Sequence, residues 1–452
     1  MSRKLCVGFS RVDISPLESV PLEGYGNTHT RMSQGILDPI MATCLAFTDE
    51  AGNTMLLMTV DHCVISGVVW PVVLPAIEQK HGLKPGAVVV AATHTHSSPA
   101  CYQPACPSAA RYTEYMIQQL ILVADQAMDN RTDAALEIAR TQNQGLNYVR
   151  HYLMEDGSVA GDNFGDYKTK KILRSITEPD RNIQLIKIKR QDERDILMVN
   201  WQAHPALAST STSDYGKAHR PFVSADYVGV VRKLIEEKTG MYFAFFQGAC
   251  GNINSRSYNP AETVTKNHEE YGAQLADYIL KGMEGFQPIA NGNVSTRRVT
   301  FHGKVNHTED HLLDIAKEIS ALWQKENNYR MCADMGKPYG INSPYHANSI
   351  IAKAGMAEYL DMNIGAGAVG NVGFAFIPYE PFDTNGMFIK EHSPFEMTFV
   401  LGYANGYYNY VPSKLGFEYS CYETNSCKHI PGTGEAVADS IVDMLKQLHD
   451  QA

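Results

Sequence analysis

Residues 88–102 read VVVAATHTHSSPACY, and this stretch decides how the rest of the sequence is interpreted. The apolar, β-branched residues at its start are typical of a strand buried inside a sheet. The run ends on His94 and His96, which a single threonine separates. In extended backbone the side chains at i and i+2 point to the same face, so both imidazoles are expected to line one pocket. The alternative is structural, with Nδ1 of each ring bonded to a nearby carbonyl.

Segments with the pattern of strands and of helices alternate along the chain. Strand-like runs cover 6–14, 42–48, 53–62, 87–96, 182–190, 196–205, 241–248, 372–380 and 399–412. Apolar residues at three-four spacing indicate helices at 68–82, 111–130, 227–240, 268–285, 310–327 and 435–450. This alternation predicts an α/β fold with mixed, largely buried β-sheets flanked by helices.

Composition limits the class of protein. The chain has 452 residues, of which 44% are hydrophobic and 19% charged, and its net charge is -10. A chain of this size and composition can bury a large core, and we expect a single domain over 1–452 with a possible subdomain or lid at about 305–350. The acidic balance excludes a nucleic-acid binder, which normally carries a basic face.

The sequence contains no visible secretory signal and no apolar stretch of membrane-spanning length. We therefore expect a cytoplasmic protein without a transmembrane segment. The nine cysteines are odd in number, and the spacings of Cys101 to Cys106 and Cys421 to Cys427 match no standard zinc knuckle. Reduced, structural thiols are the expectation.

Four apolar runs end on groups that can bind a metal, namely His94 with His96, His204, Glu380, and Tyr407 with its neighbours. Ligands of α/β sheets bind beyond the carboxyl ends of the strands. Imidazoles with one carboxylate form a common zinc ligand set. The sequence thus predicts a zinc site at strand ends, although each of these residues alone is also an ordinary strand-end residue.

Several further motifs occur in a fixed order. They are GFSRVDISP, GILDPIMATCLAF, ATHTHSSPA, NWQAHP, FVSADYVG, FFQGACGNIN, FIPYEPF, GYANGYYNYVP, CYE and PGTGE. Together they resemble the catalytic domain of the neutral/alkaline non-lysosomal ceramidase family over nearly the whole chain. The resemblance implies that His94, His204, Glu380 and Tyr407 bind zinc. From the residues alone, Tyr403, Tyr408 and Tyr410 were equal alternatives to Tyr407.

The resemblance also implies catalytic residues. His96, and less closely Arg150 in LNYVRHY, match family residues placed around the scissile carbonyl. Ser224 in SADYVG matches a family serine assigned as a nucleophile, although the glycine, asparagine and lysine of the family motif are absent here. Ser224 with Asp226 equally suits an N-cap of the following helix. Asp61 and Asp226 are candidates to orient the metal ligands or to supply a proton.

These residues predict a zinc-dependent hydrolase that cleaves an amide or ester bond with metal-activated water. The substrate is expected to be a small molecule or lipid-like. The family's ceramidases are secreted or membrane-facing and carry a carboxy-terminal immunoglobulin-like domain, and we expect this chain to be a short form without that domain. A small polar or sugar-derived substrate is therefore an alternative to ceramide, as are lyase or isomerase chemistry on the same zinc site and a non-catalytic metal-binding protein.

Overall fold

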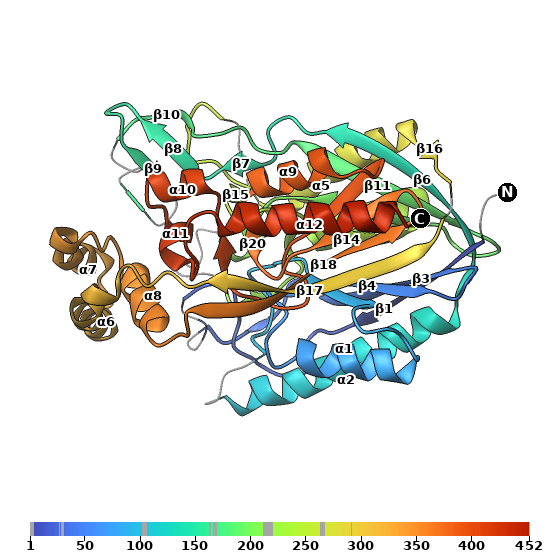
Figure 1. Cartoon of the computed structure of the whole chain (residues 1–452), viewed down its shortest axis with the longest axis horizontal. Coiled ribbons are helices and arrows are strands. Elements are labelled where there is room, and N and C mark those ends of the chain that lie inside the picture. Colours follow the sequence, from blue (N-terminus) through green and yellow to red (C-terminus); the bar gives the residue numbers. More distant parts are fainter. Residues whose placement is uncertain are drawn as a thin grey trace.

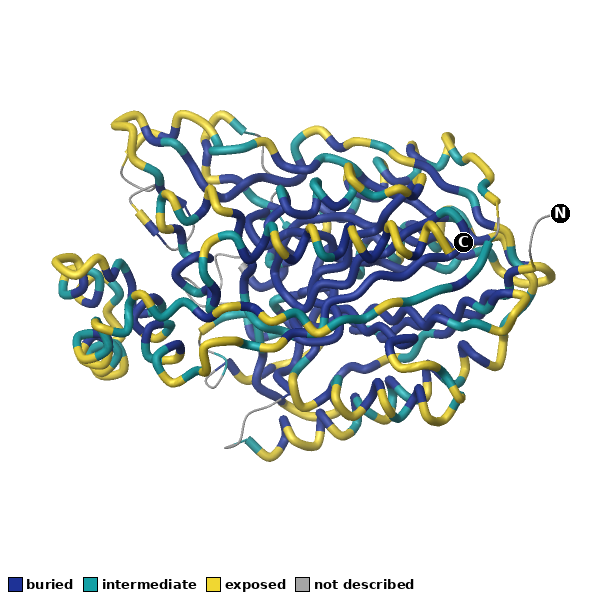
Figure 2. Tube along the Cα trace, in the orientation of Figure 1, coloured by how far each residue is buried: buried dark blue, intermediate teal, exposed yellow. Residues whose placement is uncertain are grey.

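The computed structural model describes residues 4–26, 28, 31–101, 106–161, 164–165, 170–210, 220–262, 267–290 and 292–451. Over these residues the chain forms four layers, in the order helices, large sheet, smaller sheet, helices (Figure 1). The buried residues concentrate in the sheets and in the helix faces that contact them (Figure 2). Among the described residues, no helix has both the length and the apolar character needed to cross a membrane.

The large sheet combines antiparallel and parallel pairs. Its order is β14 (Tyr242–Gln247), β12 (Ile196–Trp201), β11 (Asn182–Arg190), β6 (Thr132–Gln142), β1 (Leu5–Asp13), β3 (Met41–Asp49), β4 (Thr54–Val60) and β5 (Val88–Ala92), and β16 (Gln287–Pro288) pairs with β6. The two edge pairs, β12 with β14 and β4 with β5, are parallel. One face packs on α1 (Trp70–Lys80), α2 (Pro107–Asp129), α4 (Asp226–Thr239) and α5 (His268–Gly282).

The other face of the large sheet packs on a second sheet. This sheet has the order β17 (Val294–Lys304), β18 (Tyr359–Val369), β19 (Val372–Phe376) and β21 (Met397–Leu401). Phe374 and Phe399 contribute to the apolar layer between the two sheets, together with Phe47 and Phe246 of the large sheet. The outer face of the second sheet is covered by α9 (Asp383–His392) and α12 (Thr433–His449).

Shorter elements surround these layers. They are β2 (Gly35–Ile36), β7 (Tyr148–Val149), β8 (His151–Met154), β9 (Val159–Gly161), β10 (Ile172–Ser175), α3 (Leu207–Thr210), β13 (Phe222–Val223), β15 (Ile253–Asn254), β20 (Glu380–Pro381), β22 (Tyr410–Val411), α10 (Lys414–Glu418) and α11 (Tyr422–Ser426). The predicted α/β class with buried mixed sheets is confirmed.

Several predicted strands end earlier than expected. The strands predicted at 196–205 and 372–380 end at Trp201 and Phe376. The strand predicted at 87–96 ends at Ala92, so both histidines lie in the following loop. The strand predicted at 399–412 ends at Leu401. Positive φ angles at Tyr403 and Asn405 interrupt the extended backbone there. These corrections have the same cause. A run of β-branched residues predicts a strand but does not locate the point where the backbone turns.

The segment predicted as a subdomain or lid folds as a helical unit. It contains η3 (Asp310–Leu312), α6 (Leu313–Glu326), α7 (Tyr329–Gly336) and α8 (Pro344–Ala354), and it has its own small apolar core. In Figure 1 this unit projects from one end of the molecule. Glu309 receives a hydrogen bond of 2.7 Å from His346 and pairs with the buried Lys353 at 2.9 Å. Whether the unit moves as a lid remains a prediction.

Glu309→Gln is expected to destabilise this unit by about 3 kcal/mol near pH 6.5, because it leaves a buried ammonium uncompensated. Burial acts to raise the pKa of Glu309, but His346 and Lys353 outweigh it and hold the pKa at about 2. The unfolded carboxyl titrates near about 4.3. The stabilisation is therefore complete above that pH and is lost as the pH falls towards 2. Urea titrations followed by circular dichroism at pH 6.5 and 3 measure the difference.

Glu358→Gln is the matched control, since Glu358 pairs with Lys304 at an exposed position. An equal urea midpoint for wild type and Glu309→Gln at pH 6.5 would contradict the assignment.

Candidate metal centre

The candidate metal ligands come together where strands of the two sheets end. His94 follows β5 and His204 follows β12, both in the large sheet. Glu380 lies at the start of β20, after β19, and Tyr407 follows β21. The strands β19 and β21 belong to the second sheet. The loops are tied together by backbone hydrogen bonds, including Ala92 N to Tyr403 O at 3.3 Å. These residues thus lie beyond the carboxyl ends of strands, which is the position that the sequence predicts.

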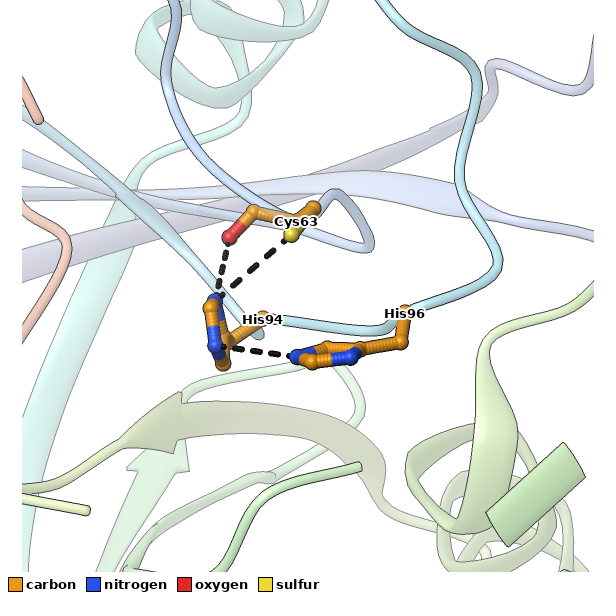
Figure 3. A group of neighbouring side chains, drawn as sticks. All are labelled: Cys63, His94 and His96. Atoms are coloured by element: carbon orange, nitrogen blue, oxygen red, sulfur yellow. Dashed lines mark hydrogen bonds between the residues drawn. The ribbon is translucent and has the colours of Figure 1, made fainter. Parts of the chain in front are cut away.

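His94 is held by the backbone of Cys63. Its Nδ1–H donates to the Cys63 carbonyl at 2.7 Å, as Figure 3 shows. This bond fixes the tautomer and leaves the Nε2 lone pair available. His94 has φ of 68°, a left-handed conformation that non-glycine residues rarely adopt and that is concentrated at functional sites.

His204 is held in the same way. Its Nδ1–H donates to the carbonyl of Ile253 at 2.9 Å, and its buried Nε2 makes no hydrogen bond. Burial, followed by the charge of Arg150, lowers the pKa of His204 to about 4. The imidazole is therefore neutral at neutral pH, which is the form that binds metals.

Two separations between candidate ligand atoms match the spacing expected around a tetrahedral ion. Nε2 of His94 and Nε2 of His204 lie 3.4 and 3.3 Å from Oε2 of Glu380. Bonds of about 2.0–2.1 Å at tetrahedral angles separate two ligand atoms by roughly 3.3–3.4 Å. These buried residues therefore fit a zinc ion, for which imidazole nitrogen and carboxylate oxygen are common ligands.

The charges at this point also favour a cation. Burial raises the pKa of Glu380, but the adjacent His94 and His204 outweigh it and hold the pKa well below its usual range. A carboxylate thus faces an imidazole lone pair of His204 in a buried environment. Two electron-rich groups at this distance repel each other unless a positive charge lies between them.

Two other groups of metal-capable residues occur among the described residues. Cys63, His94 and His96 form one, drawn in Figure 3. Its thiol lies 3.8 Å from His94 Nδ1, the nitrogen whose hydrogen the Cys63 carbonyl already receives. His151, Cys421 and Glu423 form the other, but both carboxylate oxygens of Glu423 are occupied by His151 and Arg150. The group of His94, His204 and Glu380 is therefore the best candidate.

Two tyrosines contact the candidate carboxylate. Tyr407 donates to Oε1 of Glu380 at 2.6 Å. Tyr403 donates to Oε2 at 3.3 Å, and its ring stacks on that of His94 with centroids 4.1 Å apart. Burial and Glu380 raise the pKa of Tyr407 well above its usual value. Tyr403, which the residues alone left as an equal alternative to Tyr407, thus also contacts the candidate carboxylate.

His96 lies beside His94, with the two Nε2 atoms 3.2 Å apart. The two rings therefore lie side by side. The reason given for expecting this is wrong, because the backbone at His94 is not extended. Burial, followed by the neighbouring His94 and His204, lowers the pKa of His96 well below its usual value.

Arg150 reaches the same region from the loop between β7 and β8. Its Nε pairs with Glu423 at 2.6 Å, and its Nη2 donates to the Gly251 carbonyl at 2.7 Å and to Tyr410 Oη at 3.2 Å. These contacts hold the guanidinium in one orientation. Sequence reasoning missed Glu423, because a partner 273 residues away leaves no local pattern.

Ser224, Asp226 and Asp61 have other partners. Ser224 Oγ donates to Asp38 and accepts from the backbone amide of Asp226 at 2.9 Å. It precedes the helix cap, which is Ala225. Asp226 accepts from the amide of Ala208 at 2.6 Å, and burial raises its pKa to about 6.

The Asp61 carboxylate contacts Arg232 and the amide of Met41. Among the described contacts, the carboxylates of Asp61 and Asp226 thus make none with the candidate metal-binding histidines.

No protein-family model matches the sequence. The crystal structure of neutral ceramidase from Pseudomonas aeruginosa aligns with a TM-score of 0.72 and 16% identity, over 100% of this chain and 75% of that chain. A ceramidase complexed with C2 aligns with a TM-score of 0.70 and 16% identity, over 99% and 76% of the two chains. The chain has the fold of neutral ceramidase. The resemblance seen in the motifs is confirmed at the level of this ceramidase fold.

Substitutions distinguish between the two groups of metal-capable residues that share His94. His204→Ala is expected to abolish metal binding, since it removes one of three ligand atoms. Cys63→Ala is expected to retain about one zinc per chain, because the Cys63 carbonyl and not its thiol orients His94. Elemental analysis of the purified variants measures both. Loss of metal in Cys63→Ala with retention in His204→Ala would reverse the assignment.

Proposed function

We propose that the protein is a zinc-dependent, ceramidase-like hydrolase that cleaves an amide (N-acyl) or ester bond, with His94, His204, Glu380 and Tyr407 as the zinc ligands. The tetrahedral spacing of the His94, His204 and Glu380 atoms is the observation that supports it most strongly. A zinc ion at this point supplies a Lewis acid for a carbonyl group and acidifies water at neutral pH.

His96 is proposed to move the proton that the leaving group requires. Its imidazole is neutral at neutral pH, and it is only partly buried, next to His94. A neutral imidazole at hydrogen-bond distance from the reacting atoms can take a proton and return it to an amine or alcohol.

Arg150 is proposed to stabilise the negative charge that develops on the carbonyl oxygen. Glu423 and the Gly251 carbonyl hold its guanidinium in place, so little reorganisation is needed during reaction. Ser224 is proposed to be structural, because Asp38 and the amide of Asp226 already occupy its hydroxyl. The same argument favours structural roles for Asp61 and Asp226.

The substrate is proposed to be an N-acyl amine or ester, either lipid-like or small and polar. The relatives that share the fold are described as ceramidases. Ceramide therefore belongs in the first substrate panel, with short N-acyl amines and esters. Lyase or isomerase activity at the same site predicts turnover without release of an amine or alcohol.

His96→Ala is expected to lower kcat by about 10²–10⁴-fold while the zinc content stays unchanged, because a proton-transfer group is lost but no ligand is. Glu380→Gln is expected to lose both zinc and activity. The assay measures amine release from a short-chain ceramide and from N-octanoyl amines, and alcohol release from octanoate esters. Glu391→Gln, at an exposed position of α9, is the matched control.

Full activity in zinc-free Glu380→Gln would contradict the proposal. So would the absence of any amide or ester hydrolysis by zinc-loaded wild type over the whole panel.

A further inference from the structure

Residues 20–26 and 31–33 near the amino terminus pair with each other as the two arms of a hairpin, and the first arm packs directly against His96. Pro21 pairs with Met32, and Leu22 N donates to the Arg31 carbonyl at 2.9 Å. Gly24 has φ of 110°, and a Cβ there would lie 2.6 Å from Cα of His96. The hairpin therefore forms a wall of the site, and only glycine permits this close approach.

Arg31 on this hairpin is buried, with 4% of its surface exposed. Its Nη2 donates to the carbonyls of His96 at 2.7 Å and Glu23 at 2.6 Å. The guanidinium carbon lies 4.9 Å from the centre of the Tyr25 ring, and that ring contacts the His96 ring edge-on. Arg31 is thus fixed in place beside the proposed proton-transfer residue.

Two nitrogens of Arg31 have no hydrogen-bond partner in the part of the chain that the structure describes. Its buried Nε and Nη1 make no hydrogen bond, and the described residues include no carboxylate within ion-pair distance of the guanidinium. Burying an unpaired charge is costly unless a counter-ion arrives. The guanidinium of Arg31 is thus anchored through Nη2, while Nε and Nη1 make no hydrogen bond. A guanidinium held in this way is suited to bind an anion.

Glu23 on the same hairpin does not act as the counter-ion. It meets Arg31 through its backbone carbonyl, and its buried Oε2 is unpartnered as well. Burial raises the pKa of Glu23 to about 7. The hairpin therefore carries buried polar atoms that have no hydrogen-bond partner among the described residues, namely Nε and Nη1 of Arg31 and Oε2 of Glu23.

We infer that Arg31 binds a carboxylate on the substrate, so that the enzyme acts on N-acyl compounds carrying one carboxylate close to the scissile bond. This inference rests on the proposed amide hydrolysis and names its substrate class. A carboxylate is a monoanion that can accept two hydrogen bonds, which matches the single positive charge and the two unpartnered nitrogens of Arg31. The hydrogen-bonding requirement also disfavours substrates that lack the group, because they leave the guanidinium unpaired.

The test compares each acid with its own methyl ester. N-octanoylglycine places the carboxylate on the amine side of the amide, and N-octylsuccinamic acid places it on the acyl side. Zinc-loaded wild type is expected to show a kcat/KM at least about 30-fold higher for the acid than for its ester in one of the two pairs. The pair that shows the preference identifies the side on which Arg31 acts.

Arg31→Met is expected to remove this preference mainly by lowering kcat/KM for the acid, and Arg31→Lys is expected to restore part of it. Arg111→Met is the matched control, since Arg111 is an exposed arginine of α2 that pairs with Glu18. It changes the net charge equally and should leave the acid-to-ester ratio at the wild-type value. If Arg31→Met does not fold, the wild-type ratio and Arg31→Lys still decide the question.

Equal kcat/KM for acid and ester in both pairs would overturn the inference and leave the proposed hydrolysis standing. If no probe is cleaved, the hydrolysis proposal fails instead, and calorimetric titration of N-octanoylglycine and N-octylsuccinamic acid tests Arg31 alone. Binding of either acid that is lost in Arg31→Met but kept in Arg111→Met supports the anion site. Absence of binding to wild type, or equal binding by all three proteins, overturns it.

Discussion

The candidate centre depends on two hydrogen bonds from imidazole to backbone carbonyl. Cys63 O receives Nδ1–H of His94 and Ile253 O receives Nδ1–H of His204, so both Nε2 atoms are directed towards one carboxylate. Without these bonds either ring could rotate or change its tautomer, and the tetrahedral spacing at Glu380 would be lost. The Cys63 carbonyl lies in the loop after β4 and the Ile253 carbonyl lies in β15, so the fold itself sets the geometry.

The two-sheet architecture explains why the ligands are so distant in sequence. His94 and His204 follow strands of the large sheet, whereas Glu380 lies in the short strand β20 that follows β19 of the second sheet, and the apolar layer between the two sheets fixes their separation. Left-handed backbone at His94, Tyr403 and Asn405 is concentrated in the loops that meet here. Such conformations cost of order 1–3 kcal/mol each and persist where the surroundings impose them.

Sequence patterns predicted the layers and the strand-end placement of His204 and Glu380, because buried strands have a strong apolar signature. They did not predict the turn at His94, the role of the Cys63 backbone or the partner of Arg150, since each depends on contacts between distant segments. Nor did they predict Arg31, whose significance lies in the partners it lacks once buried. Ser224 illustrates the reverse case, in which a motif match met a hydroxyl already bonded to Asp38.

An X-ray structure of the zinc-incubated protein, with anomalous data collected on both sides of the zinc absorption edge, tests the central claim most directly. We expect a strong peak about 2.0–2.2 Å from His94 Nε2, His204 Nε2 and Glu380 Oε2, with both Nδ1 atoms still bonded to the carbonyls. A well-ordered site without such a peak, or zinc bound instead by the Cys63 thiol, would contradict it.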